Sequence, residues 1–124
     1  MGKYLYIVGK ILVVDDAAIA LTIVTRMIEK QGHTVVTAND GEAGIAKVKT
    51  DRPDVVVTDL LMPKIDGLEF LSAVKQFDAT IPVIVLTANI QDSVRQRCIA
   101  AGASAFLKKP PSLEELHEAI GRVT

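Results

Sequence analysis

Three aspartates close two apolar stretches of this chain, and their placement is its strongest chemical signal. Asp15 and Asp16 follow the run ILVV, and Asp59 ends the run VVVT. An Ile/Leu/Val-rich run that stops in carboxylates is typical of a buried strand whose carboxyl end carries a functional side chain. Brought together, three carboxylates would repel one another and would need a divalent cation to stay ionised. Oxygen ligands favour Mg²⁺, which keeps several waters and binds phosphate oxygens, so the pattern predicts phosphoryl chemistry.

The composition fits one domain and excludes several classes of protein. With 124 residues, 49% of them hydrophobic, the chain is long enough to bury an aliphatic core. Its 14 basic and 15 acidic residues give a net charge of −1, which offers no basic surface for nucleic acid. The single Cys98 cannot form an internal disulfide, and the longest apolar stretch near the N-terminus is too short for a signal peptide or a membrane span. We therefore expect a cytoplasmic domain without direct contact to membrane or nucleic acid.

Short Val/Ile-rich runs alternate with helical patterns along the chain. The predicted strands cover residues 10–14, 34–38, 54–58, 82–86 and 105–107, and the predicted helices cover 17–30, 42–50, 68–77, 93–101 and 113–123. Such alternation predicts right-handed crossovers and a parallel sheet with helices on both faces. The nearly unbroken apolar character of ILVV, VVV and VIVL agrees with strands that are buried on both faces.

Residues at the predicted helix ends support these assignments. Asn39 or Asp40 can cap the second helix, and Gly102 suits a left-handed residue that ends the fourth. Ser112, with Glu115 three residues later, forms the sequence signature of a capping box at the start of the last helix.

Two further polar residues follow the remaining central strands: Thr87 closes VIVLT, and Lys109 follows AFLK and precedes Pro110. With ILVVDD, DLLMPKIDG, VLTA and LKKP in this order, the chain resembles the response-regulator receiver domains of the CheY type. The resemblance covers residues 10–123, and implies that residues 1–9 are an extension of uncertain origin before a single receiver domain. It also implies a doubly wound, flavodoxin-like sheet of strand order 2-1-3-4-5, for which CheY is itself the type example. In that order ligands bind between strands 1 and 3, where the three aspartates lie.

The resemblance implies a role for each matching residue of the acidic site. Asp59 would be the nucleophile and phospho-acceptor. Asp16 and Asp59 would bind Mg²⁺ directly, together with the backbone carbonyl of Leu61, and Asp15 would act through water. Lys109 would pair with Asp59 at rest and with a phosphoryl oxygen afterwards, and the peptide bond between Lys109 and Pro110 would be cis.

Other matching positions imply a switch and its modulators. The Thr87 hydroxyl would bond a phosphoryl oxygen and draw residues 88–91 inward, and Phe106 would turn into the vacated space. This change would reshape the surface formed by the fourth helix, the fifth strand and the fifth helix. Leu61, Ala88 and Asn89 occupy positions that modulate access of water to the phosphoryl group.

The remaining residues of note have structural or ordinary roles in this interpretation. Pro63 and Pro110 shape loops, and Gly67 is expected to permit the turn into the third helix. His33 and His117 have no partner at metal-ligand spacing, so we expect both to be ordinary surface residues.

The resemblance implies a phosphorylation-dependent signalling switch of two-component systems, either chemotaxis-like or part of a phosphorelay. It would accept a phosphoryl group from a histidine kinase, a histidine phosphotransfer protein or a small acyl phosphate, and signal to a downstream protein or output domain. It would not be a turnover enzyme, and would be a monomer or a weak phosphorylation-dependent dimer. One alternative is a docking module that is never phosphorylated. Another is an aspartate-nucleophile phosphatase of the haloacid dehalogenase type, but that family requires an Asp where this chain has Leu61.

Overall fold

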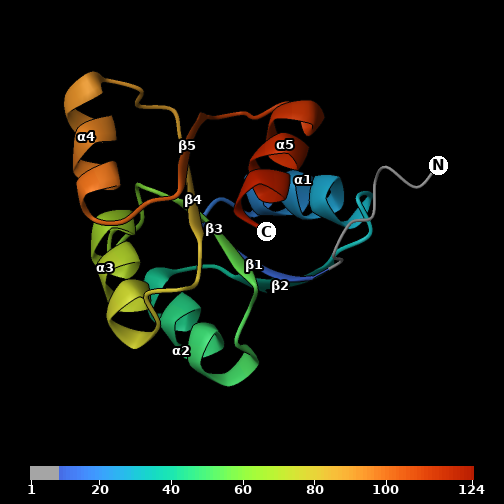
Figure 1. The fold of residues 1–124 in the computed structure, drawn as a ribbon, viewed down its shortest axis with the longest axis horizontal. Helices are drawn as coiled ribbons and strands as arrows, with labels where there is room; N and C mark the ends of the chain where they lie inside the picture. The colour runs from blue at the N-terminus through green and yellow to red at the C-terminus, as the bar shows by residue number, and fades with distance from the viewer. Residues whose placement is uncertain (1–8) are drawn as a thin grey trace.

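The sheet has five parallel strands in the order β2-β1-β3-β4-β5, as expected (Figure 1). The computed structural model describes residues 9–124. The strands are β1 (Lys10–Val14), β2 (Thr34–Ala38), β3 (Val55–Asp59), β4 (Val83–Thr87) and β5 (Ala105–Lys108), and the helices are α1 (Ala18–Glu29), α2 (Gly41–Asp51), α3 (Gly67–Phe77), α4 (Asp92–Ala100) and α5 (Leu113–Val123). Each predicted element is present, and its ends differ from the prediction by no more than about one residue. The question of an N-terminal extension falls outside the described residues, apart from Gly9.

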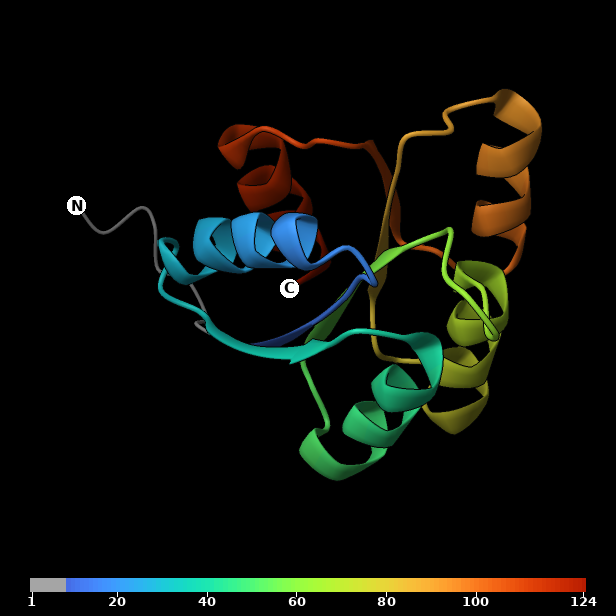
Figure 2. The ribbon, with the colours of Figure 1, turned by 180° about the vertical axis from the view of Figure 1, so that it is seen from behind.

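Helices cover both faces of the sheet. Helices α1 and α5 lie side by side on one face, and α2, α3 and α4 lie on the other (Figures 1 and 2). Side chains alternate along β1 accordingly: Ile11 and Val13 pack with residues of α1 and α5, whereas Leu12 and Val14 pack with residues of α2 and α3. Both faces of the central strands are therefore buried, which explains why their sequences are apolar without alternation. Within residues 9–124, no helix is both long and apolar enough to cross a membrane.

Helix α4 is held by a smaller cluster than the other helices. Cys98 is its one buried residue, and it packs with Leu60 and Val85. Gln91 precedes the helix and makes no side-chain hydrogen bond that would cap it. Little buried apolar surface therefore anchors α4, which makes it the helix best able to shift.

The predicted helix caps are present. Asp40, rather than Asn39, caps α2 by accepting a hydrogen bond from the Ala43 N–H at 2.7 Å. Ser112 and Glu115 form both bonds of a capping box at the start of α5. Gly102 follows α4 with φ +106°, the left-handed conformation expected of it. A second capping box, formed by Asp66 and Glu69 at the start of α3, is not among the predicted features.

At Gly67, where the chain turns into α3, the lack of a side chain allows a close backbone approach and not a positive φ angle. A Cβ atom at Gly67 would lie 2.6 Å from both the Asp59 carbonyl oxygen and the Leu60 Cα atom. The left-handed residue of this loop is instead Lys64, with φ 68°. Gly67 therefore lets the start of α3 approach the backbone directly behind Asp59.

Substitution of Gly67 by Ala is expected to reduce the free energy of unfolding by about 1–3 kcal/mol, because the new methyl group meets backbone atoms that cannot move independently. Urea denaturation measures this change. Gly121→Ala in α5 is the matched control, because a Cβ there has no neighbour within 4 Å. Alanine should stabilise that exposed helical position by roughly 0.5–1 kcal/mol. Equal stability of Gly67→Ala and the unmodified protein would contradict the packing role.

Candidate functional site

The carboxyl ends of β1 and β3 bring the three aspartates together. One carboxylate oxygen from each of Asp15, Asp16 and Asp59 lies within 4.8 Å of the others. The cause is topological, because β1 and β3 are hydrogen-bonded neighbours and their parallel ends meet at one edge of the sheet. Asp15 is buried, Asp59 is partly buried and Asp16 is exposed, so the cluster opens to solvent on one side. An all-oxygen donor set with an open side fits Mg²⁺, which retains water ligands.

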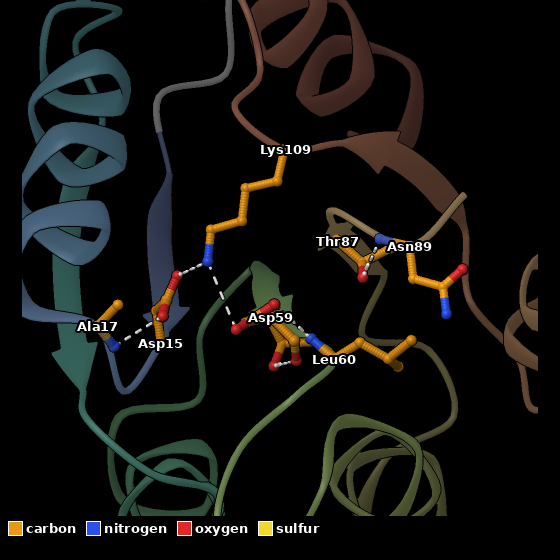
Figure 3. Close-up of polar contacts among 8 residues, drawn as sticks. Asp15, Ala17, Asp59, Leu60, Thr87, Asn89 and Lys109 are labelled. Carbon is orange, nitrogen blue, oxygen red and sulfur yellow. Dashed lines mark hydrogen bonds and ion pairs between the residues drawn. The ribbon is translucent and has the colours of Figure 1, made fainter. Parts of the chain in front are cut away.

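Lys109 pairs with two of these carboxylates but lies closer to Asp15 than the prediction implied. Its Nζ atom is 2.5 Å from Asp15 Oδ2 and 3.4 Å from Asp59 Oδ2 (Figure 3). The other oxygen of Asp15 accepts the Ala17 N–H at 2.9 Å, and Oδ1 of Asp59 accepts the Leu60 N–H at 2.8 Å. Asp15 is the more buried of the two carboxylates, and a buried charge has the greater need of a close counter-ion.

The pKa values of this cluster follow from burial and from the surrounding charges. Burial raises the pKa of Asp59, and the charge of Asp15 raises it further. The Leu60 N–H and the ammonium of Lys109 act in the opposite direction but do not cancel the increase. Burial alone would lower the pKa of Lys109, yet its bond to Asp15 and its proximity to Asp59 raise it, so Lys109 remains a cation.

Thr87 lies on the other side of Asp59 from Asp15 (Figure 3). It is fully buried at the end of β4, and its Oγ1 accepts the Asn89 N–H at 3.1 Å. The hydroxyl proton is therefore free to be donated. The Lys109 N–H donates to the Thr87 carbonyl at 2.9 Å, so the two residues are joined through the backbone.

Phe106 lies on β5, at the surface between α4 and α5. It is partly buried and packs against the cluster of Leu60, Val85 and Cys98. It also lines a groove of about 470 Å³ whose walls come from α4, β5 and α5. Phe106 is therefore in contact both with the cluster that includes Leu60, the residue after Asp59, and with the open groove.

The three residues expected to modulate access of water are all exposed to solvent. The Leu61 side chain is 70% exposed, and Ala88 and Asn89 are exposed as well. The Asn89 side-chain oxygen accepts the Gln91 N–H at 3.2 Å, which leaves only its amide group as a donor. The peptide bond between Lys109 and Pro110 is cis, as expected.

The prediction for His33 was wrong. Its side chain is buried, with 9% exposed, and its Nδ1 accepts the Gly9 N–H at 3.2 Å. The one local sequence signal for this burial is that His33 lies between a turn glycine, Gly32, and the first residue of β2. Gly32 has φ +94° in the structure. His117 is also partly buried rather than fully at the surface.

Replacement of Lys109 by Met is expected to raise the pKa of Asp59 further, because a cation 3.4 Å from the carboxylate is lost. NMR titration of the side-chain carboxyl carbon, without metal, measures this pKa. Lys108→Met is the control, because Lys108 is exposed and forms none of the ion pairs of the site.

The raised pKa of Asp59 also means that the ionised carboxylate opposes folding. The stability that protonated Asp59 contributes to the free energy of unfolding should be fully present below the unfolded pKa and be lost as pH rises through the folded pKa. An unchanged Asp59 pKa in Lys109→Met would contradict this electrostatic account.

Residues 11–121 match the family model described as "Response regulator receiver domain". The chain is 35% identical over 108 residues to the alkaline phosphatase synthesis transcriptional regulatory protein PhoP of Bacillus subtilis, covering 87% of this chain and 45% of that protein. It is 39% identical over 107 residues to the response regulator MprA of Mycobacterium ulcerans, covering 86% of this chain and 46% of that protein. The chain thus spans about half the length of these curated relatives.

Solved structures give the same result. The chemotaxis protein CheY4 of Vibrio cholerae superposes with a TM-score of 0.89 at 33% identity, covering 94% of this chain and 99% of that one. CheY of Borrelia burgdorferi, in a complex with CheX, beryllofluoride and Mg²⁺, superposes with a TM-score of 0.88 at 30% identity, covering 92% and 87%. The family-model match over residues 11–121, together with these similarities, shows that this chain belongs to the family of response regulator receiver domains.

Proposed function

We propose that this receiver domain is a phosphorylation-dependent signalling switch whose acceptor is Asp59. The single observation that carries the proposal is the cluster of three carboxylates within 4.8 Å, with the Lys109 ammonium in reach of Asp15 and Asp59. The phosphoryl donor would be a histidine kinase, a histidine phosphotransfer protein or a small acyl phosphate. Relatives named as a transcriptional regulatory protein and as response regulators support a signalling role.

The residues at the site fit a bound Mg²⁺. Asp16, Asp59 and the backbone carbonyl of Leu61 would bind it directly, and Asp15 would bind it through water. The ion would neutralise negative charge on the phosphoryl oxygens. The partial exposure of the cluster leaves room for the waters that Mg²⁺ retains.

The side chains account for the transfer itself. An ionised Asp59 oxygen attacks phosphorus, and a bond between this oxygen and phosphorus forms as the bond from phosphorus to the donor breaks. Lys109 would neutralise charge on the phosphoryl oxygens. Its Nζ atom lies 2.5 Å from Asp15 Oδ2 and 3.4 Å from Asp59 Oδ2, so a small movement would carry it from Asp15 toward a phosphoryl oxygen on Asp59. Asp59 keeps the phosphoryl group, so the domain is a self-modifying acceptor and not a turnover enzyme.

Phosphorylation would then change the surface formed by α4, β5 and α5. The free hydroxyl proton of Thr87 would bond a phosphoryl oxygen, draw residues 88–91 inward and let Phe106 turn. Moving a two-state equilibrium from 1:99 to 99:1 takes about 5.5 kcal/mol of differential binding. Because α4 is anchored by little more than Cys98, a shift of this helix would cost little packing free energy. The signal would pass, in the cytoplasm, to a downstream protein or output domain, or to a second copy in a weak dimer.

Two alternatives fit the site less well. A docking module that is never phosphorylated has no need of three repelling carboxylates beside Lys109 and Thr87. A phosphatase of the haloacid dehalogenase type requires an acid two residues after the nucleophile, where an exposed Leu61 stands.

Incubation with acetyl phosphate and Mg²⁺ is expected to add one phosphoryl group, detected by intact-mass analysis. The adduct should be absent without Mg²⁺ and absent in Asp59→Ala. Asp92→Ala is a suitable control, because Asp92 is an exposed acid in the first turn of α4 and is not one of the three clustered carboxylates. An adduct that persists in Asp59→Ala would contradict the assignment of the acceptor.

The phosphoryl group of Leu61→Asn is expected to be lost about fivefold faster than that of the unmodified protein. An amide at this position can orient an attacking water through a hydrogen bond worth roughly 1 kcal/mol, which Leu61 cannot do. Decay of the adduct after removal of acetyl phosphate measures the rate. Ile99→Asn is the control, since it places the same amide at an exposed apolar position on α4. Equal lifetimes for Leu61→Asn and the unmodified protein would exclude a role for Leu61 in excluding water.

A further inference from the structure

Two ionisable side chains hold the beginning of β1, at the end of the sheet opposite the carboxylate cluster. The Gly9 N–H donates to His33 Nδ1 at 3.2 Å, and the Lys10 N–H donates to Asp54 Oδ2 at 2.8 Å. The Gly9 carbonyl in turn accepts the Thr34 N–H at 3.0 Å. The start of β1 is therefore tied by a side chain on the β2 side and by another on the β3 side.

The contact to His33 depends on the charge of the imidazole. A ring nitrogen that accepts a hydrogen bond carries no proton, so the bond from Gly9 requires neutral His33 with its proton on Nε2. Uptake of a proton from solvent would place it on Nδ1, where it would face the Gly9 N–H. Two donors would then oppose each other, and the bond could not persist.

The surroundings of His33 favour the neutral ring. Its burial lowers its pKa, and the charge of His117 on α5 lowers it further. Asp54 of the segment before β3 lines the same cavity of about 280 Å³, but one of its oxygens is engaged by the Lys10 N–H. The ammonium of Lys10, on β1, donates to the Asp51 carbonyl. Of these neighbours, only Asp54 would favour a charged ring.

We propose that His33 is a proton-sensitive latch, which ties the start of β1 to the turn between α1 and β2 when neutral and releases it when protonated. The inference does not rest on the proposed phosphorylation. Because the folded-state pKa lies below the unfolded value of 6.5, the stabilisation by neutral His33 is complete above that value and is lost as pH falls below it. The carboxylate cluster at the other end of the sheet should be unaffected by the release.

The test is an NMR titration of the complete chain between about pH 8 and pH 5, which follows the His33 ring nitrogens and the hydrogen-exchange protection of backbone amides. At the upper pH the proton should be found on Nε2. The protection factor of the Gly9 amide should fall about tenfold as the ring becomes charged, with the same midpoint as the ring. The Leu12 amide, in the middle of β1, should keep its protection.

Two variants separate the latch from general effects of acid. In His33→Asn the amide oxygen can take about the place of Nδ1 and does not titrate, so Gly9 protection should stay constant across the same range. His117→Asn removes a neighbouring positive charge, so the midpoint should rise while the coupling of ring and amide remains. Should His33→Asn fail to fold, the coincidence of the two midpoints in the unmodified chain decides.

Three outcomes would overturn the proposal. One is a proton on Nδ1 at about pH 8, which would exclude the acceptor role. Another is constant protection of Gly9 while the His33 ring titrates. The last is an equal loss of Gly9 protection in His33→Asn and in the unmodified chain.

Discussion

Repulsion among the three carboxylates at the ends of β1 and β3 is the interaction on which the rest of the structure depends. The direct pairing of these strands places oxygens of Asp15, Asp16 and Asp59 within 4.8 Å of one another. Lys109 supplies one positive charge beside three carboxylates and so offsets their charge only in part. Burial, more than this repulsion, keeps the pKa of Asp59 raised. A site with uncompensated negative charge and one open side attracts a divalent cation. With that cation bound, the proposed role of Asp59 as phosphoryl acceptor would have positive charge available from both the ion and Lys109.

The neighbouring elements fix this cluster on one side and leave it adaptable on the other. The missing side chain of Gly67 lets the start of α3 pack directly behind the backbone of Asp59 and Leu60. On the opposite side, Lys109 and Thr87 are joined by a backbone bond, and α4 rests on a small cluster that Phe106 shares. The packing of α3 would keep Asp59 in a fixed position. The weakly packed α4 is the element that a change of charge at the site could move.

Much of this could be predicted from the sequence, for identifiable reasons. Apolar runs that end in aspartate indicated both the buried parallel strands and the edge at which Asp15 and Asp59 meet, and family resemblance indicated Thr87, Phe106 and the cis bond after Lys109. The features that were missed depend on distances between elements far apart in the chain. The preference of Lys109 for Asp15, the close approach at Gly67 and the burial of His33 are all set by tertiary packing. The capping box of Asp66 and Glu69, by contrast, has a local sequence signature, an Asp followed three residues later by a Glu, and could have been predicted.

Fluorine NMR with beryllofluoride, a mimic of a phosphoryl group, tests the central claim most directly. In the presence of Mg²⁺ the account predicts resolved signals of bound fluoride for the unmodified protein. No such signals should appear in Asp59→Ala or without Mg²⁺, and the Lys109 ammonium resonance should shift as Lys109 moves from Asp15 toward a bound fluorine. Mg²⁺-independent binding, or binding that survives the loss of Asp59, would contradict the claim that this carboxylate cluster is a metal-dependent phosphoryl acceptor.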